Sequence, residues 1–189
     1  MSNLKVFGII GLLSLVVAYS SIALSISVSP WFSWVENALS DLGARCPSGP
    51  IFNLGLMSSS VLALVFAIGL KRLHRGVLGA VSVMLYILST ISLFMVGLFP
   101  ETAGIIHYYV SVAFFVFVAL TLIAFGICSL ISHPRSITIG IMMLLLAVLA
   151  TVVWLFPWKG VAIPELISSL TISTWVVISS VRMLSARGQ

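Results

Sequence analysis

Long apolar stretches alternate with short polar breaks along the whole chain. Each stretch has about 20 residues or more, enough to cross the roughly 30 Å hydrocarbon layer of a bilayer as a helix. The pattern predicts an all-α membrane protein with six transmembrane helices in one integral membrane domain, residues 1–189. The six predicted spans are 6–28, 51–70, 77–99, 105–131, 137–156 and 163–183.

The longest polar break lies between the first two spans and has an amphipathic pattern. Trp34, Ala38 and Leu42 recur at one-turn spacing, so they would share one face of a helix. Ser33 followed three residues later by a glutamate is typical of a capping box. We therefore expect a short amphipathic helix over residues 33–43 on the outer membrane surface, with Asp41 turned toward the bundle. The opposite face would carry Glu36, Asn37, Ser40 and Asp41.

The composition indicates a membrane protein, and the positions of its charged residues predict how it is oriented in the membrane. Apolar residues make up 61% of the chain and charged residues 7%, which excludes an ordinary soluble domain. Single basic residues at the ends of spans explain the net charge of +5, so we expect no nucleic-acid partner. They predict a plasma-membrane protein with both termini in the cytoplasm and all four acids outside. The basic residues on the predicted inner side are Lys5, Lys71, Arg72, Arg75, Arg135, Arg182 and Arg187.

Polar side chains from three outer connections give a candidate site. Asn53, His107 and Glu165 each lie near the start of a span that follows an outer turn, and Asp41 lies on the predicted surface helix. Carboxylates beside an imidazole suit a metal ion, acid–base chemistry or a lipid headgroup. Glu36, Asn37 and Ser40 complete the candidate site. The alternative is that these residues only make the outer loops polar, as every membrane protein requires.

Several functions are disfavoured by what the spans lack. No Asp, Glu, Lys or Arg occupies the middle of a predicted span, which argues against a proton pump or antiporter. His74 and His133 belong to the inner side and His107 to the outer side, which argues against a bis-histidine haem. The sequence leaves open whether the protein is an enzyme, and which other cofactor or metal it would use. Cys46 and Cys128 are expected on opposite sides of the bilayer, so they would not pair.

Three short strings in the chain match a known pattern. They are Asn37-Ala38-Leu39-Ser40-Asp41-Leu42-Gly43, then Phe52-Asn53-Leu54-Gly55, then Gly97-Leu98-Phe99-Pro100-Glu101 with His107 downstream. With these strings the chain resembles the microbial membrane family labelled domain of unknown function 998. That family is distantly similar to the six-span group that contains Frag, DRAM and PGAP-two. The resemblance implies six helices and an outward polar cluster, and it implies no settled activity.

Two functions fit these observations. In the first, the outer cluster binds or modifies the headgroup of a membrane lipid, or a small molecule, at the membrane surface. In the second, the protein is a non-catalytic accessory subunit that packs against other membrane subunits.

Overall fold

The six predicted spans are confirmed as helices. The computed structural model of the protein describes residues 3–132 and 137–186. Within these residues six helices are long and apolar enough to cross a membrane. They are α1 (Asn3–Ser27), α3 (Ser48–Leu73), α4 (Gly76–Leu98), α5 (Ile105–Ser132), α6 (Ile137–Val152) with the short 3-10 helix η3 (Val153–Leu155) that continues it, and α7 (Ala162–Ser185). The protein is therefore a multi-pass membrane protein that contacts lipids.

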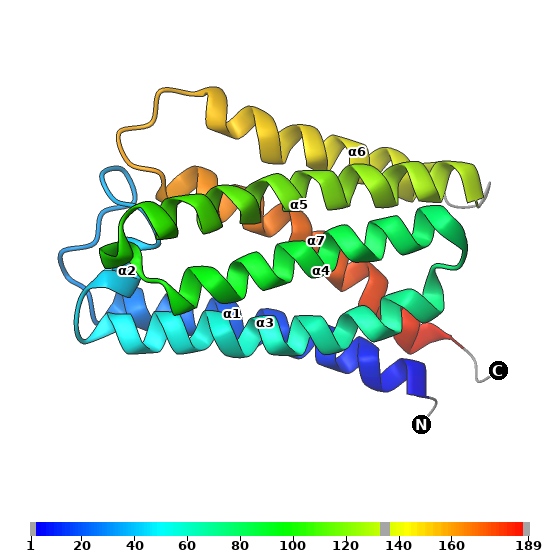
Figure 1. The fold of residues 1–189 in the computed structure, drawn as a ribbon, viewed down its shortest axis with the longest axis horizontal. Helices are drawn as coiled ribbons and strands as arrows, with labels where there is room; N and C mark the ends of the chain where they lie inside the picture. The colour runs from blue at the N-terminus through cyan, green and yellow to red at the C-terminus, as the bar shows by residue number, and fades with distance from the viewer. Residues whose placement is uncertain (1–2, 133–136, 187–189) are drawn as a thin grey trace.

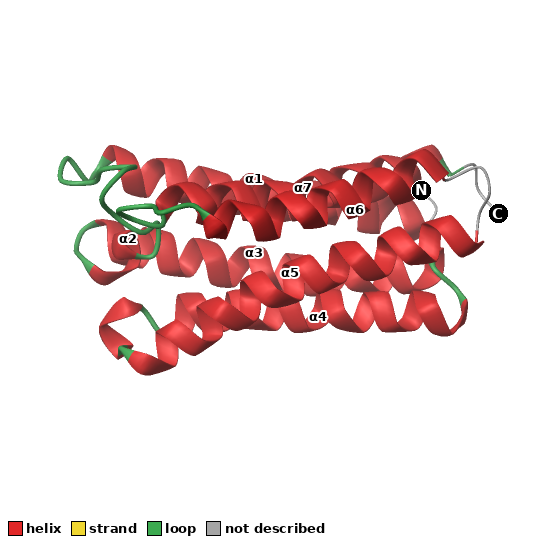
Figure 2. Cartoon of the chain, turned by 90° about the horizontal axis from the view of Figure 1, so that it is seen from above, coloured by secondary structure: helices red, strands yellow, loops and turns green. Residues whose placement is uncertain are grey.

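The spans form a closed ring. Each of the pairs α1–α3, α3–α4, α4–α5, α5–α6, α6–α7 and α7–α1 is in contact. Figure 1 shows the helices running along one long axis, with both described ends of the chain at one end of the bundle and the short helix α2 (Asp41–Ala44) at the other. As labels only, the end with both chain ends is called the inner end, and the end with α2 is called the outer end. In Figure 2, α1, α6 and α7 form the upper row of the view, and α3, α4 and α5 form the lower row. A ring of this kind encloses a central axis that side chains must fill or leave hollow.

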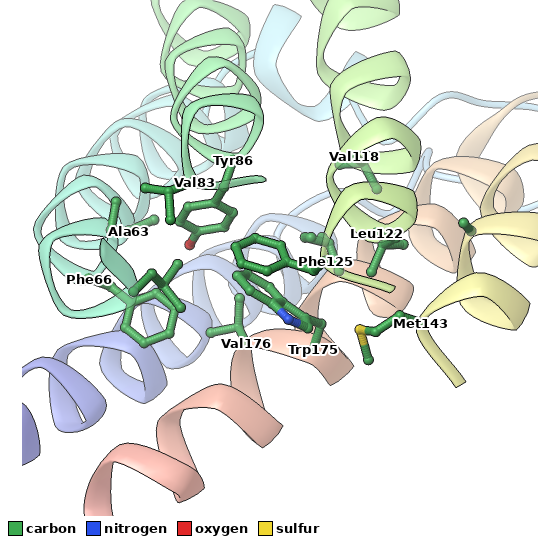
Figure 3. Packing of buried hydrophobic residues seen from close by; sticks show 14 of the residues in the cluster. Ala63, Phe66, Val83, Tyr86, Val118, Leu122, Phe125, Met143, Trp175 and Val176 are labelled. Carbon is green, nitrogen blue, oxygen red and sulfur yellow. The ribbon is translucent and has the colours of Figure 1, made fainter. Parts of the chain in front are cut away.

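Aromatic side chains fill the inner half of that axis. Phe66 of α3, Tyr86 of α4, Phe125 of α5 and Trp175 of α7 point toward one another (Figure 3). The Phe125 and Trp175 ring centroids are 4.3 Å apart, and those of Tyr86 and Trp175 are 5.3 Å apart. Such contacts contribute about 0.5–1.5 kcal/mol each beyond the area that they bury. They join four spans at this level of the bundle.

The predicted surface helix over residues 33–43 is corrected by the structure. Helix is present only in α2 (Asp41–Ala44), and Ser33 forms no cap through its side chain; its backbone N–H instead donates to Asn37 Oδ1 at 2.9 Å. The Asn37 amide donates to Asp41 Oδ2 at 2.8 Å, and the Ala38 N–H donates to the same oxygen at 3.0 Å. These side-chain bonds occupy groups that a helix would need, so the segment turns instead.

Backbone contacts with another outer loop hold this turned segment in place. The Gly160 N–H donates to the Val35 carbonyl at 2.8 Å, and the Ala162 N–H donates to the Asn37 carbonyl at 2.9 Å. A side chain at Gly160 would collide with the backbone of Glu36 and Asn37. The segment between α1 and α2 is therefore fixed against the start of α7.

Candidate functional site

A cavity occupies the outer half of the bundle axis. Its volume is about 120 Å³, several times the roughly 10–15 Å³ that one water needs on this measure. Glu165 and Val176 of α7 both line it, and α7 rises about 16 Å between them at 1.5 Å per residue. The cavity thus extends from the outer loops to the aromatic side chains at mid-bundle. Its other lining residues come from α1, α3, α4, α5 and the segment before α2, and they include Ser14, Tyr19, Ile22, Leu39, Ser40, Leu56, Ser59, Ala63, Tyr86, Ser89, Leu93 and Ser111.

The hydroxyl groups around the cavity bond mostly to the helices themselves. Ser14 Oγ donates to the Gly11 carbonyl at 2.7 Å, and Ser59 Oγ donates to the Ser14 carbonyl at 2.9 Å. Tyr19 Oη lies 2.8 Å from Ser173 Oγ, which donates to the Ser169 carbonyl at 2.7 Å. Because their O–H groups already donate to these partners, these hydroxyls can only accept hydrogen bonds from a ligand. The cavity is therefore chemically more apolar than its residue types indicate.

Glu165 stands at the outer end of the cavity. It lies in the first turn of α7, is 8% exposed, and accepts a hydrogen bond from the Leu39 N–H at Oε2, 2.6 Å away. The Ser40 N–H also bonds to it. A buried carboxyl group needs such partners, because it has lost its hydrogen bonds to water. Glu165 thereby ties the segment before α2 over the cavity and leaves a polar end on an otherwise apolar space.

Asp41 and Glu101 form a pair of carboxyl groups beside this end. They share a hydrogen bond, and that bond, followed by burial and the negative charge of Asp41, raises the pKa of Glu101 to about 7. For Asp41, burial acts to raise the pKa, but hydrogen bonds from Glu101, Asn37 and the Ala38 N–H outweigh it and lower the pKa. Glu101 is thus the proton donor of the pair. Both carboxylates act electrostatically on Glu165, so three of the four acids of the chain are close together.

The other predicted site residues have separate partners. His107 lies near the start of α5, where Nδ1 is 2.7 Å from the Phe99 carbonyl and Nε2 is 3.2 Å from Ser111 Oγ. Since a carbonyl only accepts, Nδ1 carries a proton and donates it to the Phe99 carbonyl, and Nε2 bonds to the Ser111 hydroxyl. The Asn53 amide donates to the Gly43 carbonyl at 2.9 Å and fastens α2 to α3. Asn37 bonds to Asp41, Ser40 lines the cavity, and Glu36 is exposed.

The predicted site is therefore only partly assembled by hydrogen bonds. No hydrogen bond joins any two of Asp41, Asn53, His107 and Glu165, all of which the structure describes. Asp41 and Glu165 interact through charge, and a single site of all four stays a prediction. Among residues 3–132 and 137–186, no three His, Cys, Asp or Glu side chains are grouped as metal ligands would be. His133 lies outside the described residues.

The sequence comparison places this fold in a family. The family described as "Protein of unknown function (DUF998)" matches residues 12–182, which include all six spans in whole or in part. The chain belongs to this family. No curated protein and no solved structure matches it. The more distant likeness of DUF998 to the Frag, DRAM and PGAP-two group stays a prediction.

Sequence reasoning did not find the cavity of this DUF998 protein. Tyr19, Tyr86 and Ser173 line it, but each has the appearance of a packing residue in an apolar span. The only available indication was the number of hydroxyl residues in the last span, which the sequence pattern attributes to helix packing. Glu101 was likewise not among the candidate site residues, although it is the partner of Asp41.

Proposed function

We propose that this DUF998 protein binds a membrane lipid, with one hydrocarbon chain in the cavity and the polar headgroup beside Glu165 and Ser40. The observation that carries the proposal is the cavity itself, which is apolar along its length and has a buried carboxyl group at one end. Ligand sites commonly combine an apolar lining with a few polar groups that orient the ligand.

The depth of the cavity fits one lipid chain. The distance of about 16 Å along α7 from Glu165 to Val176 is close to the roughly 15 Å hydrocarbon thickness of one leaflet. A lipid from the outer leaflet would then keep its headgroup at the level of the outer loops. The backbone bonds of Glu165 to Leu39 and Ser40 place polar groups at that same level.

The orientation in the membrane is part of the proposal. Among the described residues, Lys5, Lys71, Arg72, Arg75 and Arg182 lie at the end of the bundle that holds both described chain ends. Arg45 and Lys159 lie at the other end, together with all four acids. The positive-inside rule then places both termini in the cytoplasm and the cavity toward the outer leaflet of the plasma membrane. Arg135 and Arg187 lie outside the described residues.

The alternative role as an accessory subunit has no separate support. Apolar side chains such as Leu145, Val148 and Leu155 are more than half exposed on the bundle. Lipids cover such faces on any membrane protein, so exposure alone does not indicate another subunit.

Copurified lipid tests the proposal. We expect mass spectrometry of the purified protein to find a defined lipid that survives delipidating washes. Ala63→Leu would push a larger side chain into the cavity and reduce the retained lipid. Ala147→Leu, at an equally buried position that does not line the cavity, is the matched control. Equal retention in both folded variants would contradict lipid binding in the cavity.

A further inference from the structure

A second hollow lies on the outside of the bundle, between α3 and α4. It is an open groove with a volume of about 550 Å³, and it is separate from the axial cavity. Small side chains at Ala67 and Ala80 contribute to its lining and leave room between the helices. Ile68 and Met84 also line it and are 50% and 57% exposed, so the groove faces the surrounding lipid.

Two cations stand at one end of this apolar groove. Lys71 and Arg72 belong to the last turn of α3, at the end of the bundle opposite the outer loops. The Arg72 guanidinium lies over the Phe7 ring of α1, 5.0 Å from its centroid. Stacking uses the flat face of the guanidinium and leaves its N–H edge available for an anion.

The chain supplies no acidic side chain to neutralise these cations. All four of its acids, Glu36, Asp41, Glu101 and Glu165, lie at the other end of the bundle. An apolar groove that ends at two exposed cations has the polarity of a phospholipid with an acidic headgroup. Neither a neutral lipid nor a free anion would match both parts of this surface.

We propose that the groove binds an anionic phospholipid, with its phosphate between Lys71 and Arg72 and a hydrocarbon chain along α3 and α4. On the orientation given by the charge distribution, this lipid belongs to the cytoplasmic leaflet, which is rich in anionic lipids. The site is independent of the axial cavity, because it lies at the other end of the bundle and shares no residue with it.

Native mass spectrometry of the full chain in detergent, titrated with phosphatidylglycerol, tests this site. One basic residue near the membrane surface is worth about fivefold in affinity for an anionic lipid. We expect Lys71→Gln and Arg72→Gln each to weaken binding about fivefold, and the double variant about 25-fold. Arg75→Gln removes the same charge from the adjacent turn but does not line the groove, so we expect a smaller loss. Equal losses in all three single variants would overturn the proposal, since nearby charge alone would explain them.

A second variant tests the groove without changing charge. Ala80→Trp fills the space between the helices, and we expect it to weaken phosphatidylglycerol binding while Lys71 and Arg72 remain. Phosphatidylcholine and inorganic phosphate serve as competing probes, and we expect neither to displace phosphatidylglycerol at equal concentration. Displacement by inorganic phosphate would show an anion site rather than a lipid site. Unchanged binding in folded Ala80→Trp would show that the groove holds no chain. Either result would overturn the proposal.

Discussion

At the scale of single residues, the outer end of the bundle is organised by carboxyl groups in different environments. Asp41 is ionised and accepts several hydrogen bonds, whereas Glu101 holds a proton until pH about 7. Glu165 is buried and bonded to the backbone of Leu39 and Ser40. Glu101 therefore changes its charge near neutral pH, and it does so beside the proposed headgroup position.

This pair predicts a pH dependence of stability. The pKa of Glu101 rises from 4.5 to about 7 on folding, so its contribution is complete below pH 4.5 and is lost as pH rises through 7. We expect the wild-type unfolding temperature in detergent to fall between pH 4.5 and 7 and to change little above pH 7. Glu101→Gln, which cannot ionise, should flatten this change, whereas Glu36→Gln at an exposed site should not. A wild-type profile with no slope in this interval would argue against the shared proton.

Sequence patterns predicted which residue types lie at the outer end, but not their partners. Asp41 and Glu165 were placed there because both are next to breaks between apolar runs. The bond from the Leu39 N–H to Glu165 joins positions far apart in the chain, so no local pattern encodes it. The partnership of Asp41 with Glu101 depends in the same way on how two loops meet.

At the scale of elements, the spans followed from the sequence and the outer segment did not. A transmembrane helix is required wherever about 20 apolar residues enter a bilayer, because its backbone must satisfy its own hydrogen bonds. At the membrane surface water removes that requirement, and side chains then compete with the helix. Here the Asp41 side chain accepts hydrogen bonds from the Asn37 amide and the Ala38 N–H. The α-helix in this segment is therefore limited to α2, Asp41–Ala44.

Glu165 is predicted to hold this outer segment closed over the cavity. Glu165→Ala removes the acceptor of the Leu39 and Ser40 N–H groups, and a typical hydrogen bond contributes about 0.5–1.5 kcal/mol. We expect amide hydrogen exchange around these two residues to become about tenfold to hundredfold faster. Glu165→Gln keeps an acceptor and should have a smaller effect, and Glu36→Ala is the control in the same segment. Unchanged exchange in Glu165→Ala would show that other contacts hold the segment.

At the scale of the whole molecule, the axis of the ring is filled by side chains at mid-bundle and hollow at its outer end. Phe66, Tyr86, Phe125 and Trp175 fill the axis at mid-bundle (Figure 3). The cavity begins at Tyr86 and extends outward to Glu165. Periodicity predicts which stretches become helices, but a void depends on how side chains from five spans meet, and that information is not local.

The native cysteines give a test of the orientation. Cys46 is exposed in the outer connection, and Cys128 is buried in α5. We expect a membrane-impermeant maleimide to label intact cells at Cys46, and Cys46→Ser to abolish the labelling. Arg75→Cys in the Cys46→Ser background should be labelled only after the membrane is permeabilised. Labelling of Arg75→Cys in intact cells would reverse the proposed orientation.

Photo-crosslinking tests most directly whether a lipid chain enters the cavity. A phospholipid with a diazirine near the end of one chain would be incorporated into the membrane, irradiated and mapped on the protein by peptide mass spectrometry. We expect crosslinks at the inner part of the cavity, at Tyr86, Ile172 and Val176, and fewer of them in Ala63→Leu. Crosslinks confined to outward-facing residues such as Leu145 and Val148 would contradict it, because the lipid would then only surround the bundle.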